Sequence, residues 1–220
     1  MFSKAIVDMI LEGFWDSIYM TIVATVIAYV LGLPLGIILV VTDKEGIKPV
    51  RWLNAILGVI INILRSIPFL ILLITIIPFT RWVTGTSIGT NATIVPLVVA
   101  ATPFVARVVE SSLKEIDQGV IEAAKAMGTS TFQIIYKVLL PESLPSLIVG
   151  GALAVTTILS YSALAGFTGG GGLGDIAIRY GYNRYQTNIM LVTVALLVVI
   201  VQALQEAGMR LARLSDRRKR

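Results

Sequence analysis

An apolar stretch at residues 17–41 constrains this chain more than any other part of its sequence. It holds no charged side chain and is longer than the roughly 20 apolar residues with which a helix crosses a bilayer. Further apolar stretches follow in a chain whose residues are 56% hydrophobic and 14% charged. Because a single soluble core does not bury so much apolar surface, the sequence predicts an integral membrane protein.

Five stretches have the length and apolar character of membrane-spanning helices, which places the chain in the all-α class. They belong to one transmembrane domain that covers residues 1–220. The expected spans are residues 17–41, 55–79, 92–109, 147–167 and 187–207. A polar segment, residues 111–146, separates the third span from the fourth.

Two features lie beside or inside these spans. Residues 1–16 are expected to form an interfacial helix, because Ile6, Ile10 and Phe14 repeat every four residues beside an acidic row. Arg65 interrupts the second span, and an arginine at membrane depth costs roughly 3 kcal/mol on insertion scales. We therefore expect Arg65 either to anchor the helix at the cytoplasmic surface or to pair with an acidic group or helix end in the protein core.

The absent residue types narrow the possible chemistry. The sequence has no cysteine and no histidine, so it lacks a disulfide framework, a thiolate metal site and the commonest general base. We expect no cofactor and no catalytic site in this chain.

The net charge of +5 does not indicate nucleic-acid binding, because the basic residues lie at the C-terminus and beside apolar segments. Membrane topology accounts for that distribution better.

The polar segment between the third and fourth spans contains the signals of two short helices joined by an elbow. Asp117 can cap the first helix, and Gly128 can adopt the positive φ with which a helix commonly stops. Ser130 and Gln133 have the spacing of a capping box that starts the second helix. Pro141 is expected to end that second helix.

Each short helix has an apolar face by its three- and four-residue spacing. The expected faces are Val120, Ile121 and Ala124 in the first helix, and Phe132, Ile135 and Leu139 in the second. Such a pair of faces fits a groove on another protein.

The polar segment also carries a recognisable motif. Glu122, Ala123 and Ala124 are followed at fixed spacing by Gly128 and by Leu140 and Pro141. This pattern resembles the EAA loop of permease subunits of ATP-binding cassette (ABC) importers, with Val138 where that family more often has isoleucine. The resemblance implies that the segment is a coupling helix, which sits in a cleft of a cytoplasmic ATPase and passes its motion to the membrane helices. The plain alternative is an ordinary amphipathic connector.

Two further stretches lie in and after the fourth span. A polar cluster at residues 156–162 either faces a pathway or forms hydrogen bonds between packed helices. Tyr161, Ser162 and Leu164 are candidates for lining or gating such a path.

The glycines of residues 169–174 are not a phosphate loop, because Asp175 and Ile176 follow them instead of lysine and serine or threonine. They are expected to form a flexible turn that permits close backbone approach.

The basic residues give an orientation if the five spans alternate. One side carries Lys44, Lys48, Arg51, Arg107, Lys114, Lys125, Lys137 and the tail from Arg210 to Arg220. The other side carries only Lys4, Arg81, Arg179 and Arg184. By the positive-inside rule, the N-terminus lies outside, and the C-terminus and the polar segment lie in the cytoplasm. The basic tail is expected beside anionic lipid.

The resemblance extends over nearly the whole chain and is closest to methionine importer permeases of bacteria, most specifically in residues 65–69, 85–89, 122–145 and 161–174. It implies a type I importer permease in the inner membrane, working as a homodimer without catalytic activity of its own. It also implies two partners, an ATPase subunit that binds ATP and Mg²⁺ and an extracellular substrate-binding protein. Transport would proceed by alternating access.

Other functions stay open at this point. The substrate of an importer of this kind could instead be another amino acid, an osmolyte or a small anion. A secondary transporter driven by an ion gradient would need internal repeats and an intramembrane carboxylate, and the spans contain neither clearly. A membrane scaffold without transport is disfavoured by the complete EAA pattern.

Overall fold

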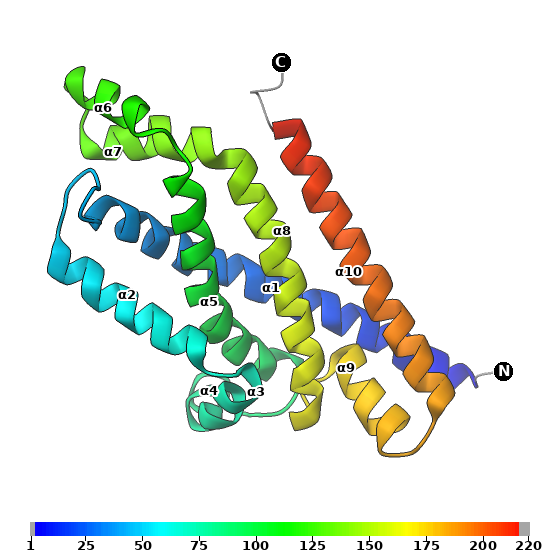
Figure 1. Ribbon diagram of the computed structural model, residues 1–220. Coiled ribbons are helices and arrows are strands. Elements are labelled where there is room, and N and C mark those ends of the chain that lie inside the picture. The colour runs from blue at the N-terminus through cyan, green and yellow to red at the C-terminus, as the bar shows by residue number, and fades with distance from the viewer. Residues whose placement is uncertain (1–2, 216–220) are drawn as a thin grey trace. The chain divides into compact units, whose positions relative to one another are not determined.

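The computed structural model describes residues 3–215, and these residues form helices and connecting turns without a strand (Figure 1). The α-helices are α1 Lys4–Thr42, α2 Arg51–Ser66, α3 Phe69–Thr75, α4 Ile77–Thr84, α5 Thr90–Lys114, α6 Gln118–Ala126, α7 Thr131–Ile134, α8 Leu140–Ala165, α9 Gly172–Ile176 and α10 Thr187–Ser215. Two π-helical turns, Ile135–Leu139 and Ala177–Tyr182, and a 3₁₀ turn, Gly166–Thr168, complete the order.

Four stretches of helix in the described part of the chain are long and apolar enough to cross a membrane. They are Lys4–Thr42, Thr90–Lys114, Thr131–Thr168 and Thr187–Ser215. A fifth span arises if α2 and α3, which are bent by 100° at their junction, count as one broken span. The all-α membrane fold expected from the sequence is thereby confirmed.

The first helix is longer than expected. The helix expected over residues 1–16 is present in its described part but is continuous with the first span, because α1 runs unbroken from Lys4 to Thr42. The amphipathic and apolar halves both have helical patterns, and no turn signal separates them. At 1.5 Å per residue the 39 residues of α1 extend about 58 Å, nearly twice the hydrocarbon thickness. Part of α1 therefore lies beyond the bilayer or strongly tilted within it.

The second expected span is divided at Pro68. Helix α2 ends at Ser66, and α3 begins after Pro68, which occupies its N-cap position. Proline lacks the backbone N–H of a helix interior and disfavours helical geometry in the residue before it. Arg65, in the last turn of α2, is exposed and forms no ion pair with any residue of the described chain.

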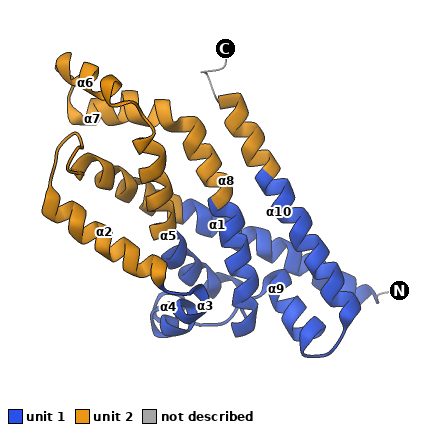
Figure 2. Cartoon of the chain, viewed as in Figure 1, with its two compact units in different colours: residues 1–27, 67–101, 154–205 blue, residues 28–66, 102–153, 206–220 orange. Residues whose placement is uncertain are grey.

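The chain divides into two compact units, and α1, α5, α8 and α10 each contribute to both (Figure 2). Unit 1 comprises the described residues of 1–27, 67–101 and 154–205, and unit 2 those of 28–66, 102–153 and 206–220. The basic tail from residue 216 onward lies outside the described residues.

Unit 1 is built around the glycine-rich turn. Its buried core contains Ile10, Leu159, Leu173 and Ile200. The turn is anchored at several points: the Leu173 N–H donates to Ser17 Oγ at 2.8 Å, Thr93 Oγ1 donates to the Gly170 carbonyl at 3.1 Å, and the Gly89 N–H donates to the Gly169 carbonyl at 2.9 Å. The close backbone approach expected for these glycines is present, but it occurs in a turn held by hydrogen bonds.

Unit 2 joins α1, α2 and α5. A Cβ added at Gly32 would lie 2.8 Å from Val105, and one added at Gly36 would lie 2.6 Å from the Ala106 carbonyl oxygen. These two glycines therefore let α1 lie directly on the backbone of α5. Leu39, Ile61 and Ala106 form the buried core between the three helices. The Asn54 amide donates to the Leu39 carbonyl at 2.7 Å and so fixes α2 to the end of α1.

Candidate functional site

The polar segment folds as two short helices with the expected elbow. The carboxylate of Asp117 caps α6 by accepting a hydrogen bond from the Gly119 N–H at 2.7 Å. Gly128 has φ of 72°, and its N–H donates to the Lys125 carbonyl at 2.9 Å. The next N–H, of Thr129, donates to the Ala124 carbonyl at 3.2 Å. This pair of hydrogen bonds is a Schellman motif, so the predicted helix stop is confirmed.

The second short helix starts as the sequence predicts. The Ser130 N–H donates to Gln133 Oε1 at 3.0 Å, and the Gln133 N–H donates to Ser130 Oγ at 3.4 Å. Both halves of the capping box are present. We call α6, the turn at Gly128, α7 and the following π turn, residues 117–139, the elbow segment.

The expected helix end at Pro141 is wrong. Helix α7 ends at Ile134, and the chain continues through the π turn Ile135–Leu139 directly into α8, whose second residue is Pro141. In a regular α-helix the Pro141 ring would press on the carbonyl of residue 137. The wider π turn lies at that position, so the chain passes the proline without breaking.

The π turn also changes which apolar residues face inward. Ile121, Ala124, Ile134 and Leu139 are buried, whereas Phe132 is 75% exposed. The expected shared face of Phe132 and Leu139 is therefore wrong, because the wider turn shifts the angle between them. Besides Phe132, three further large apolar side chains of the elbow segment are exposed: Val120, Met127 and Tyr136.

The residues of the EAA pattern divide into buried and exposed sets. Ala124 is buried against the rest of unit 2, and Leu140 is half-buried. The exposed members are Glu122, Ala123, Gly128 and Pro141. The elbow segment thus presents a carboxylate, small residues and large apolar side chains to its surroundings.

A chain of charged groups adjoins the elbow segment. Lys114, the last residue of α5, donates to Asp43 at 2.6 Å and to Glu110 at 2.9 Å. Glu110 also pairs with Arg107 at 2.5 Å. The hydrogen bond from Lys114 lowers the pKa of Asp43. Three members of this cluster lie on α5, but the contact of Lys114 with Asp43 joins α5 to the loop after α1, and spacing in the sequence could not predict that contact.

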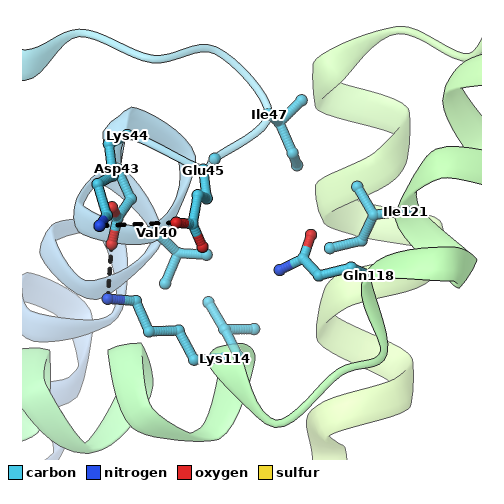
Figure 3. A pocket seen from close by; sticks show the side chains of 10 residues that line it. Val40, Asp43, Lys44, Glu45, Ile47, Lys114, Gln118 and Ile121 are labelled. Atoms are coloured by element: carbon cyan, nitrogen blue, oxygen red, sulfur yellow. Dashed lines mark ion pairs between the residues drawn. The ribbon is translucent and has the colours of Figure 1, made fainter.

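A cleft of about 340 Å³ lies next to the charged chain (Figure 3). It is lined by the loop after α1, the end of α5 and the start of α6. Figure 3 shows Ile47 reaching into it from the loop, and Gln118 and Ile121 from α6. Polar and apolar side chains contribute to the lining together.

The pathway candidates of α8 have different environments in unit 1. The Tyr161 ring stacks on Phe69 of α3, with 4.6 Å between ring centroids and 2° between ring planes. Ser162 is buried, and its hydroxyl donates to the Leu159 carbonyl of its own helix at 2.7 Å. Leu164 is exposed. The structure thus adds Phe69 to the candidates and does not gather the three α8 residues on one face.

Comparisons with known proteins agree with one another. A family model for the binding-protein-dependent transport system inner membrane component matches residues 32–220. The probable D-methionine transport system permease protein MetI of Vibrio cholerae is 50% identical over 211 residues, which cover 96% of this chain and 94% of that protein. The methionine import system permease protein MetP of Bacillus subtilis is 40% identical over 181 residues, 82% of each chain.

A solved structure gives the same result for the fold. It is a chain of the MetNI methionine ABC transporter in an inward-facing conformation. The similarity has a TM-score of 0.97 at 45% sequence identity and covers 98% of this chain and 100% of that chain.

Proposed function

Because this chain belongs to the family of binding-protein-dependent transport system inner membrane components, we propose that it is the membrane-spanning permease subunit of an ATP-driven methionine importer. The observation that carries the proposal is 50% identity to a methionine permease across 96% of the chain. The TM-score of 0.97 to a chain of a methionine ABC transporter agrees with it.

The elbow segment is the contact to a separate ATPase subunit. Its exposed groups suit a groove, with the Glu122 carboxylate for a polar contact and Met127 and Phe132 for apolar ones. Buried Ile121 and Ala124 hold α6 to the rest of unit 2, so a displacement of the ATPase surface is passed to the membrane helices. In this assignment Glu122, Ala123, Ala124, Gly128, Leu140 and Pro141 form the coupling motif. ATP and Mg²⁺ bind to the ATPase, and this chain needs no cofactor.

The assembly consists of two copies of this chain, two ATPase subunits and an extracellular substrate-binding protein. Four or five spans in one chain do not easily enclose a pathway, and a two-fold pair provides one along its axis. The complex lies in the bacterial inner membrane with the N-terminus outside and the C-terminus in the cytoplasm. The distribution of basic residues supports this orientation.

Transport proceeds by alternating access. The loaded binding protein docks outside, ATP closes the ATPase dimer, and the elbow segments are drawn together so that the path opens outward. Hydrolysis then restores the inward-facing state. Tyr161, Ser162 and Leu164 line or gate the path, with the Tyr161 ring held against Phe69.

Reconstitution tests this function. The chain, its ATPase and its binding protein are placed in liposomes, and uptake of radiolabelled methionine is measured with ATP or with a non-hydrolysable analogue. We expect uptake only with ATP and the binding protein together. Uptake that persists without ATP and stops when an ion gradient is collapsed would assign the chain to secondary transport. Competition by other amino acids, osmolytes and anions distinguishes the remaining substrates.

A further inference from the structure

A continuous chain of four charged residues joins three helices of unit 2. We propose that Asp43, Lys114, Glu110 and Arg107, called the charged chain here, hold the elbow segment at a fixed angle to α1, α2 and α5. They are positioning residues for ATP-driven transport and touch neither ATP nor substrate. This inference rests on the proposed function.

The contacts of the charged chain run from one helix to the next. Lys114 Nζ lies 2.6 Å from Asp43 Oδ2, beyond the end of α1, and 2.9 Å from Glu110 Oε1. Glu110 Oε2 accepts from Arg107. The guanidinium of Arg107 then donates to α2, to Asn62 Oδ1 at 2.8 Å and to the Gly58 carbonyl at 3.2 Å.

Burial separates these pairs from ordinary surface ion pairs. The side chains of Glu110, Asp43 and Arg107 are 11%, 23% and 24% exposed, and that of Lys114 is 46% exposed. The neighbouring pair of Lys44 and Glu45 is 73% and 80% exposed and 3.6 Å apart. Exposed pairs contribute little, whereas removal of one partner from a buried pair leaves an uncompensated charge. The charged chain is therefore a stronger constraint than the neighbouring pair of Lys44 and Glu45, which is its matched control.

The position of the charged chain connects it to the elbow segment. Lys114 ends α5, and only residues 115–117 separate it from α6. Buried Ile116 anchors this short connection. On the other side, Ser146 donates to Ser112 at 3.0 Å and ties α8 to α5. The elbow segment is thus fixed at both ends to the helix that carries the charged chain.

The cleft beside Lys114 explains why an ion pair is needed there. It lies between the loop after α1 and the start of α6, where Ile47 and Ile121 border it (Figure 3). The contact of Asp43 with Lys114 bridges the loop and α5 along the edge of this cleft. Without that contact, α5 and the elbow segment gain freedom to tilt into the cleft without moving α1. The ATPase would then hydrolyse ATP without opening the path.

The test is the number of ATP molecules hydrolysed per methionine imported by the complete reconstituted importer. For Asp43→Asn, which leaves the contact of Lys114 with Glu110 intact, we expect a rise of about fivefold, the lower end of typical coupling between sites. Glu45→Gln, in the same loop, is the control and keeps the wild-type ratio. Lys114→Arg preserves both ion pairs and stays near the wild-type ratio, whereas Lys114→Met raises it.

Poor folding and lost positioning give different results. Fewer assembled complexes lower ATP hydrolysis and uptake in the same proportion and leave the ratio unchanged. An unchanged ratio for both Asp43→Asn and Lys114→Met overturns the inference. If the wild-type complex shows no ATP-dependent methionine uptake, the proposed function itself fails.

A second measurement does not depend on the substrate. Because the chain has no native cysteine, two introduced cysteines at exposed positions 45 and 127 can be spin-labelled without side reactions. The distance distribution between the labels is expected to broaden in Asp43→Asn relative to the same doubly labelled chain with Asp43. Equal widths in the two proteins contradict the inference whatever the substrate is.

Discussion

The turn at Gly128 offers the sharpest test of the elbow segment as the coupling element. Its φ of 72° lies where L-residues are strained, and its N–H donates to the Lys125 carbonyl at 2.9 Å. Proline fixes φ near −65° and has no N–H, so Gly128→Pro removes both the conformation and the hydrogen bond. The penalty is about 3 kcal/mol, the size that proline imposes inside a helix.

A milder variant separates backbone strain from steric clash. A Cβ added at Gly128 meets no atom within 4 Å. Gly128→Ala therefore costs only the strain of the left-handed conformation, about 1–2 kcal/mol. With 1.4 kcal/mol for each tenfold change, we expect Gly128→Pro to lower the population of the elbow about 100-fold and Gly128→Ala about tenfold.

The assay is methionine uptake by membranes that contain equal amounts of each variant, together with the amount of ATPase that is co-purified. Both quantities are expected to fall in the order Gly, Ala, Pro while the chain stays in the membrane. Normal uptake by Gly128→Pro at the wild-type amount of protein would refute the reasoning. Equal losses for alanine and proline would contradict the graded backbone penalty.

Three further predictions follow from single contacts. Glu122→Lys should abolish co-purification of the ATPase, whereas Glu115→Lys, at an exposed carboxylate before α6, should preserve it. If both variants co-purify equal amounts of ATPase, Glu122 is not part of the interface. Phe69→Ala removes a buried ring stacked on Tyr161 and should lower the free energy of unfolding by about 3–5 kcal/mol. Thermal unfolding of the purified chain measures this loss, and Phe69→Leu should lose less of the free energy of unfolding. Because the folded-state pKa of Asp43 is lowered, its ion pair stabilises the fold above the unfolded pKa of about 3.9 and is lost as pH falls through the folded pKa. The difference in melting temperature between wild type and Asp43→Asn should thus be constant from neutral pH to about pH 5 and shrink below about pH 4; shrinkage near neutral pH would be inconsistent with this assignment.

Local features of the elbow segment could be predicted because each depends on residues within a few positions. The cap at Asp117, the stop at Gly128 and the capping box of Ser130 with Gln133 all satisfy backbone groups of their own turn. The effect of Pro141 could not be predicted in the same way. A proline rule assumes a regular α-helix, and the π turn before it changes that geometry.

Contacts between distant segments were beyond sequence reasoning. Asp43 and Lys114 each stand among polar residues at a helix end, where charged side chains are usually solvated. Phe69 and Tyr161 each belong to apolar stretches in which an aromatic ring is unremarkable. Only the fold brings the members of each pair together. The motif identified the family, but the residues that support the motif come from other helices.

The glycines of α1 have a further consequence for motion in unit 2. A rotation of α1 about its own axis would turn Leu35 or Ile37 toward α5 in place of Gly36, where a single added carbon would already lie 2.6 Å from the Ala106 carbonyl oxygen. Such a rotation therefore requires the two helices to separate first. The glycines determine which face of α1 meets α5, and the contact of Asp43 with Lys114 limits the tilt that remains.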